Sequence, residues 1–185
     1  MALTKKLIMQ LFSEIDEELR LIDQQADLFM IGGAAMTVVY DARPSTKDID
    51  GIFQPSQPLR LIIKKIAARH GLDEDWMYDA AKGAISQVKE TNPIVVFDGE
   101  FFSVSTPSVQ YLLATKMLAS RRDRDDSDIK LLVKECGFST SQQCLDVVQK
   151  YYPTWVIEPK TQYLIEELIT EMNRDHFRQR NGYQI

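Results

Sequence analysis

Two stretches of the sequence are the most informative about fold and function: Phe29-Met30-Ile31-Gly32-Gly33 and Asp48-Ile49-Asp50. The first is typical of a short buried strand that turns at two glycines into an apolar helix, which we expect over residues 34–40. The second opens an apolar strand that runs to residue 53. Glycine lets the backbone approach a ligand closely, and the unpaired amides at a helix start attract anions. Gly32 and Gly33 are therefore predicted to bind phosphate.

The two aspartates carry the second part of this hypothesis. Side chains alternate along a strand, so Asp48 and Asp50 are expected on one side and Ile49 on the other. Two acids on a strand that enters a core are costly unless a cation or hydrogen-bond donors compensate them. Paired carboxylates suit Mg²⁺ or Mn²⁺ and leave coordination positions for substrate phosphates. A tight turn at the glycines and a solvated turn at the aspartates are the structural alternatives.

Composition limits the classes of protein that fit. The chain has 185 residues, is 44% hydrophobic and 26% charged, and carries a formal net charge of −5. These values are typical of a globular protein of one domain with or without a helical extension, and they argue against a broad basic surface for nucleic acid. Cys136 and Cys144 lack metal-ligand spacing, so we expect reduced core thiols. The start of the chain reads neither as a signal peptide nor as a membrane span, so the expected compartment is the cytoplasm.

The order of elements predicts an α+β fold. Helices are expected over residues 3–22, 58–70, 73–81, 107–120, 124–136, 139–151 and 159–174, with Trp76 as a core anchor and a Ser139–Gln142 capping box. Asp98-Gly99 between two apolar runs predicts a β-hairpin of residues 94–97 and 101–104. We interpret residues 1–106 as the α/β core and residues 107–185 as a helical region packed on it.

Lys116 stands out in the helical region because its helix is apolar on nearly all sides. A buried amine needs anionic partners, and either a nucleotide phosphate or the Asp48/Asp50 pair would serve. A lysine whose stem snorkels to an edge is the structural alternative. The acidic helix start that follows offers a third carboxylate, for which Asp128 is the first candidate and Asp125 the second. Asp98 and Glu100 compete for this role, although a hairpin turn explains both of them well.

These residues together resemble the DNA polymerase β-like nucleotidyltransferase superfamily, and within it the minimal bacterial nucleotidyltransferases related to abortive-infection and type IV toxin–antitoxin toxins. The likeness covers roughly residues 28 to 136. It rests on four features in order: Gly32-Gly33, Thr46-Lys47-Asp48-Ile49-Asp50, Lys116, and Arg124-Asp125-Asp126-Ser127-Asp128. Many members have Gly-Ser where this chain has Gly32-Gly33, so phosphate would be held here by backbone alone. The resemblance implies a nucleotidyltransferase-like mixed sheet flanked by helices.

The resemblance also implies an activity. Asp48 and Asp50 would hold Mg²⁺ (or Mn²⁺) while a nucleoside monophosphate moves from an NTP to an acceptor hydroxyl. Gly32, Gly33 and Thr46 belong to the nucleotide site, and Lys116 would neutralise phosphate charge. Asp128 or Asp125 would orient the acceptor. Arg43 and Lys47 are either phosphate contacts or solvated charges.

The acceptor is the open question. Family likeness suggests a tRNA end and a toxin with an antitoxin partner. A local basic strip would serve RNA, and its arginines are Arg121, Arg122, Arg124, Arg174, Arg178 and Arg180. Adenylyl transfer to a protein or to a cationic small molecule such as an aminoglycoside is an alternative, as is a catalytically quiet nucleotide-binding or antitoxin-like module. No membrane partner is expected.

Overall fold

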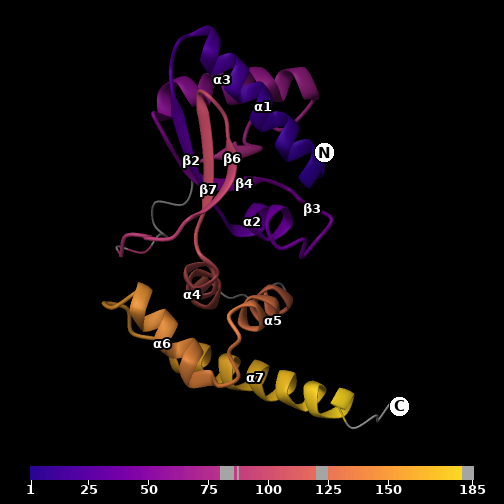
Figure 1. Ribbon diagram of the computed structural model, residues 1–185, viewed down its shortest axis with the longest axis vertical. Helices are drawn as coiled ribbons and strands as arrows, with labels where there is room; N and C mark the ends of the chain where they lie inside the picture. Colours follow the sequence, from indigo (N-terminus) through magenta and orange to yellow (C-terminus); the bar gives the residue numbers. More distant parts are fainter. Residues whose placement is uncertain (80–85, 87, 120–124, 181–185) are drawn as a thin grey trace. The chain divides into compact units, whose positions relative to one another are not determined.

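A computed structural model describes residues 1–79, 86, 88–119 and 125–180, and over these residues the apolar patterns of the sequence form a mixed sheet and seven helices (Figure 1). The predicted α+β class is confirmed. The chain divides into two units, residues 1–85 with 90–108 and residues 86–89 with 109–185.

The first unit is built on a five-stranded sheet with the order β5-β4-β2-β7-β6. Its strands are β2 (Ala26–Ile31), β4 (Ile49–Gln54), β5 (Met77–Tyr78), β6 (Ile94–Asp98) and β7 (Phe102–Thr106). β2 runs antiparallel to β4 and parallel to β7, β5 runs parallel to β4, and β6 runs antiparallel to β7. The start of β4 therefore lies at the same end of the sheet as the end of β2.

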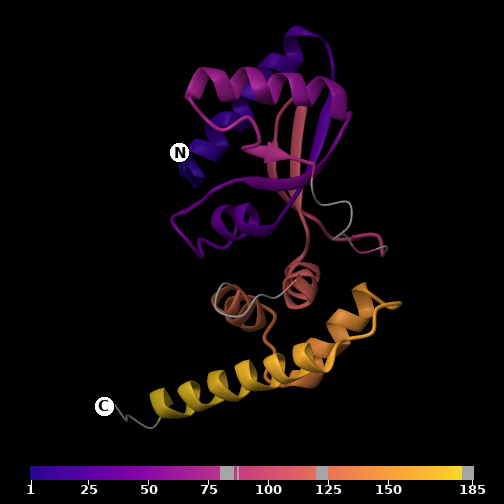
Figure 2. The same cartoon turned by 180° about the vertical axis from the view of Figure 1, so that it is seen from behind.

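Two long helices of this unit, α1 (Lys5–Leu21) and α3 (Ser56–His70), lie side by side (Figures 1 and 2). α1 buries the apolar side chains along one of its faces. One of them, Phe12, packs edge-on against the Phe102 ring, with 5.8 Å between the ring centroids. Burial of such a face is what stabilises an amphipathic helix on a sheet. Gly71 ends α3 in the left-handed conformation, as the sequence predicted.

The short helix α2 (Gly32–Val38) follows β2 directly. A small second sheet pairs β1 (Leu3–Thr4) with β3 (Ser45–Thr46), and β3 lies just before β4 in the chain. α2, β3 and the start of β4 are thus brought together at one end of the five-stranded sheet.

The second unit contains only helices among its described residues: α4 (Val109–Ala119), α5 (Asp126–Glu135), α6 (Ser141–Tyr151) and α7 (Pro159–Arg180). α4 packs against the other three and is buried along most of its length, which explains its apolar sequence. α7 buries side chains only in its first half, among them Leu164 and Ile169. Its last three turns are mostly exposed.

Three local predictions were wrong. Residues 77–78 form strand β5 instead of part of a helix over 73–81, although Trp76 is in the core as expected, 2% exposed and donating from Nε1 to the Ile63 carbonyl at 3.1 Å. Leu3 and Thr4 form β1 instead of the start of a helix over 3–22, and α1 begins only at Lys5. The capping box of α6 uses Thr140 and Gln143, one residue later than predicted.

Both cysteines are free thiols, as predicted. Burial raises the pKa of Cys144 to about 12 and that of Cys136 to about 11. Neither thiol is therefore ionised near neutral pH.

Candidate active site

The glycine turn lies where the sequence predicted it, between β2 and α2. Ile31 is the last residue of β2, and Gly32 has a φ of +70°. A residue with a Cβ is strained at this angle, so glycine is the natural choice here. Ala34 and Ala35, the next residues of α2, are fully buried, so the start of α2 is anchored in the core of the first unit.

Asp50 faces this turn directly. It is the register partner of Ile31 across the antiparallel β2–β4 pair. A Cβ added to Gly32 would lie 3.0 Å from Oδ2 of Asp50. The carboxylate therefore lies directly beside the turn, and a side chain at position 32 would crowd it.

Thr46 faces the second glycine, Gly33, as Asp50 faces Gly32. A Cβ on Gly33 would lie 2.9 Å from Thr46 Oγ1 and 3.8 Å from Nη1 of Arg43. The Thr46 hydroxyl donates to the Asp48 carbonyl at 3.2 Å, which ties β3 to the residue before β4. The structure thus brings together Gly33, Thr46 and Arg43, while the Lys47 residue is exposed to solvent.

Asp48 and Asp50 flank a fully buried residue. Ile49 is 0% exposed and its amide donates to the Trp76 carbonyl at 2.8 Å, whereas both aspartates are partly exposed. Both carboxylates also act on one phenol: the charge of Asp50 raises the pKa of Tyr78, with further contributions from burial, from the charge of Asp48 and from a hydrogen bond to Asp50. Both carboxylates therefore lie within electrostatic reach of the Tyr78 hydroxyl.

This donor set fits a divalent cation. Carboxylate oxygens are the ligands that Mg²⁺ prefers, and one or two of them suffice when phosphate oxygens and water complete the shell. Within residues 1–79, 86, 88–119 and 125–180, no group of three or more His, Cys, Asp or Glu side chains is arranged to hold a metal. Among the described residues of the first unit, the candidate ligands are therefore the two aspartates Asp48 and Asp50.

Asp98 is too far away to be the third carboxylate. It pairs with Ser103, which pairs in turn with Asp27, and Asp27 pairs with Gln54. Asp98 therefore lies at the opposite end of the strands, about 13 Å along the strand direction from Asp50 and three strands away in the sheet.

The predicted residues of the second unit form a cluster of their own. Nζ of Lys116 lies 2.9 Å from Oδ1 of Asp125 and 2.9 Å from Oδ2 of Asp128. The three side chains are 12%, 14% and 2% exposed. Lys116 comes from α4, Asp125 is the N-cap of α5 and Asp128 lies in its first turn, so the amine joins the two helices.

Sequence reasoning identified all three members of this cluster but not that they contact one another. The signal was present: four acids follow Lys116 within twelve positions, and Asp125 and Asp128 are two of them. An ion pair removed from water needs each of its partners, because a buried charge left alone is strongly destabilising.

The predicted basic strip is only partly described. Arg121, Arg122 and Arg124 lie outside the described residues, as does the side chain of Arg180. Arg174 and Arg178 are exposed on α7, where they line a shallow hollow of about 380 Å³ together with Thr170, Asn173 and Phe177. Phe177 is 67% exposed. The five residues that line the hollow include no acid, but Glu171 lies on the same helix, and its pKa is lowered first by its hydrogen bond with Lys130 and also by the charge of Arg174.

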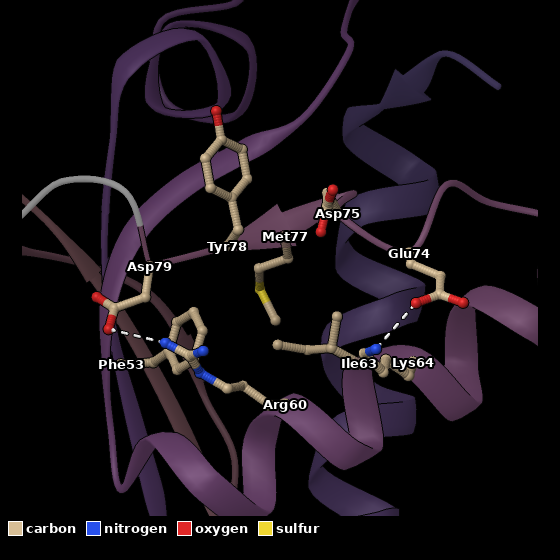
Figure 3. A pocket seen from close by; sticks show the side chains of 9 residues that line it. All are labelled: Phe53, Arg60, Ile63, Lys64, Glu74, Asp75, Met77, Tyr78 and Asp79. Carbon is tan, nitrogen blue, oxygen red and sulfur yellow. Dashed lines mark hydrogen bonds and ion pairs between the residues drawn. The ribbon is translucent and has the colours of Figure 1, made fainter.

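Tyr78 is the residue near the aspartates that the sequence did not reveal, because the predicted helix over 73–81 obscured its place on β5. Figure 3 shows the pocket beside it, with a volume of about 230 Å³ and α3 on one side. Met77 points toward Ile63 and Arg60, while the Tyr78 hydroxyl points away from them (Figure 3). An ion pair between Arg60 and Asp79, 3.6 Å apart, lies across the pocket from Tyr78 (Figure 3).

Among the described residues, no helix is both long enough and apolar enough to cross a membrane. Comparison with curated proteins and with solved structures gave no match. A family model described as "nucleotidyltransferase of unknown function" (DUF6036) matches residues 6–154, which include the glycine turn, the aspartate pair and the Lys116 cluster. The chain therefore belongs to this family of nucleotidyltransferases of unknown function.

Proposed function

We propose that the protein is a metal-dependent nucleotidyltransferase that moves a nucleoside monophosphate from an NTP to an acceptor hydroxyl. The observation that carries this proposal is the contact between the glycine turn and Asp50, where a Cβ on Gly32 would lie 3.0 Å from Oδ2. This contact sets backbone amides suited to phosphate beside a carboxylate suited to a cation.

Asp48 and Asp50 would hold Mg²⁺ or Mn²⁺. When bound, the cation neutralises charge on the triphosphate and orients it for in-line displacement. The acceptor hydroxyl attacks the α-phosphorus, its proton passes to solvent or to a nearby carboxylate, and pyrophosphate leaves. The roles left to the protein are positioning and electrostatic stabilisation of the transferred group.

The residues around the turn would bind the triphosphate. Gly32 and Gly33 offer backbone N–H groups, and Arg43 offers a guanidinium beside Gly33. Thr46 supports the site through its bond to the Asp48 carbonyl. Lys47, exposed next to the aspartates, adds positive charge at the entrance.

The second unit would supply Lys116 for phosphate charge and Asp128 or Asp125 for the acceptor. Two ion pairs of 2.9 Å hold the amine in place within this cluster, which favours a role as a positioned charge. The likeness to polymerase β-like enzymes supports these assignments by the order of motifs alone.

RNA is the acceptor that we favour, with a tRNA end as the specific candidate and a toxin-like role with an antitoxin partner. The exposed face of α7 supports it, because Arg174 and Arg178 can pair with phosphates and Phe177 can stack on a base. Removal of both arginines should weaken tRNA binding at low salt and reduce its salt dependence. Unchanged binding would point instead to a protein or a small-molecule acceptor.

Transfer of label tests the reaction itself. The protein is incubated with Mg²⁺, cell extract and each of four NTPs labelled at the α-phosphate, and the RNA, protein and small-molecule fractions are counted. Asp50→Asn should lower labelling about a thousandfold, because a catalytic cation contributes several kcal/mol to transition-state stabilisation. Asp98→Asn is the matched control, since it removes an aspartate at the opposite end of the sheet.

Two results would contradict the proposal. Equal labelling by wild type and Asp50→Asn would show that the pair holds no essential metal. Tight NTP binding with no release of pyrophosphate, in the presence of every acceptor fraction, would favour the catalytically quiet module.

A further inference from the structure

Tyr78 lies next to Asp50 on the neighbouring strand. The two residues are register partners in the parallel β4–β5 pair, so their side chains leave the same face of the sheet about 5 Å apart at the backbone. Met77, the other residue of β5, points to the opposite side, toward Ile63 (Figure 3). Strand geometry alone therefore directs the phenol to the side of the aspartates.

The exposure of Tyr78 does not suit a purely structural role. Its side chain is 39% exposed, in contrast to its neighbours Trp76 and Met77, each 2% exposed. The pocket of Figure 3 does not enclose its hydroxyl, which points away from the residues of α3. The phenol thus contributes little to the core and is accessible from the carboxylate side.

The register of β4 and β5 places the phenol O–H where it can donate to the Asp50 carboxylate. A phenolic O–H donates to one lone pair of a carboxylate, which has about four acceptor positions. Such a bond leaves the other positions open to a cation and fixes the orientation of the group. On the other side of the carboxylate, Gly32 lies so close that an added Cβ would be 3.0 Å from Oδ2 of Asp50.

We propose that Tyr78 is a positioning residue for the Asp48–Asp50 pair, holding the Asp50 carboxylate in the orientation that binds a divalent cation. This inference rests on the proposed function, since it assigns the pair to a metal. It adds a residue from β5 that neither the motifs nor the family description contains.

The expected size of the effect follows from other metal sites. Loss of a hydrogen bond that orients a metal-binding side chain weakens metal binding about 10- to 100-fold. Asp50 keeps the contact with the glycine turn, so the lower end applies. Tyr78→Phe should therefore weaken Mn²⁺ binding about tenfold, and saturating metal should restore most of the transfer rate.

The test measures Mn²⁺ binding to the free protein by electron paramagnetic resonance, without NTP and without turnover. Wild type, Tyr78→Phe and the control Tyr163→Phe are compared, the last because Tyr163 is exposed on α7, remote in sequence from every proposed ligand. A near-ultraviolet difference spectrum on addition of Mn²⁺ serves as a second readout. It should show a perturbed phenol in wild type and in Tyr163→Phe, and no such change in Asp50→Asn.

The outcomes separate this inference from the proposed function. Equal Mn²⁺ affinity in wild type and Tyr78→Phe, or a wild-type spectrum that Mn²⁺ leaves unchanged although it binds, would overturn the role of Tyr78 alone. Absence of Mn²⁺ binding by wild type would overturn the metal site and this inference with it. The difference spectrum is recorded on proteins that keep Tyr78. It therefore tests the role of Tyr78 even if the Tyr78→Phe variant does not fold.

Discussion

The contact between Gly33 and Thr46 leads to a prediction in which one substitution changes sign with its background. A Cβ on Gly33 would lie 2.9 Å from Thr46 Oγ1, closer than non-bonded atoms tolerate. The hydroxyl must therefore move, and its bond to the Asp48 carbonyl must break or lengthen. Gly33 does not have a positive φ, so alanine is otherwise compatible with the backbone.

The size of the effect follows from three contributions. Loss of the hydrogen bond costs about 1 kcal/mol. Displacement of a stiff β-branched side chain from its rotamer costs about 0.5–1.5 kcal/mol. Replacement of glycine by alanine at a compatible position stabilises by about 0.4–1 kcal/mol. Gly33→Ala should thus lower the free energy of unfolding by about 1 kcal/mol. In a Thr46→Ala background only the last contribution remains, and the same substitution should raise it by about 0.5 kcal/mol.

Urea unfolding of the four proteins of this cycle measures both values. Thr46→Ser is the matched control, because it removes the methyl group but keeps the oxygen, and Gly33→Ala should still destabilise in that background. Additive effects in the Thr46→Ala cycle would refute the close approach of α2 and β3. A Gly33→Ala effect near zero in wild type would refute it as well.

Three further predictions concern other parts of the molecule. Lys116→Met should destabilise the protein by about 3 kcal/mol, because it leaves the 2% exposed Asp128 side chain without the amine; thermal unfolding at neutral pH measures this. Burial raises the pKa of Glu14, but hydrogen bonds, first that from His70, outweigh it and set the pKa below 4.5. Because the pKa of Glu14 is lower in the folded protein than in the unfolded chain, its carboxylate stabilises the fold above its ordinary pKa. The stability difference between wild type and Glu14→Gln should therefore shrink as the pH falls through the lowered pKa of Glu14. The raised pKa of Cys144 predicts no native labelling by a thiol reagent at neutral pH and prompt labelling in denaturant.

Each of these has a result that would contradict it. If the Lys116→Met variant were as stable as wild type, water would already screen the charges of Lys116, Asp125 and Asp128. A stability difference at Glu14 that is constant with pH would exclude a lowered pKa. Prompt labelling of the folded protein at Cys144 would show that its buried position is frequently opened.

Much of the fold was predictable because its signals are local. The strand before Gly32, the hairpin at Asp98-Gly99 and the apolar helix around Lys116 each show a clear period or turn chemistry within a few residues. Gly71 ends its helix for the same reason. The α+β class followed from the order of these elements.

What escaped prediction depends on contacts between distant segments. β5 has only two residues, too few for a period, and it exists because Met77 and Tyr78 pair with the start of β4. The position of Tyr78 beside Asp50 could not be read without that pairing. The capping box of α6 was wrong by one residue because Ser139–Gln142 and Thr140–Gln143 both satisfy the motif.

The aspartate pair illustrates the same limit from another side. Alternation along a strand predicted that Asp48 and Asp50 would share a side, and Ile49 is indeed in the core. The contact of Asp50 with Gly32 required in addition the register of β2 against β4, in which Ile31 pairs with Asp50. Register is fixed by packing over the whole sheet and not by either motif.

Anomalous X-ray scattering from crystals soaked in Mn²⁺ and a non-hydrolysable NTP analogue would locate both the metal and the triphosphate. If Asp48 and Asp50 bind the metal as proposed, we expect a manganese peak about 2.1 Å from carboxylate oxygens of both, with triphosphate density next to the Gly32–Gly33 turn. Triphosphate bound elsewhere, or a manganese peak that neither aspartate contacts, would contradict it.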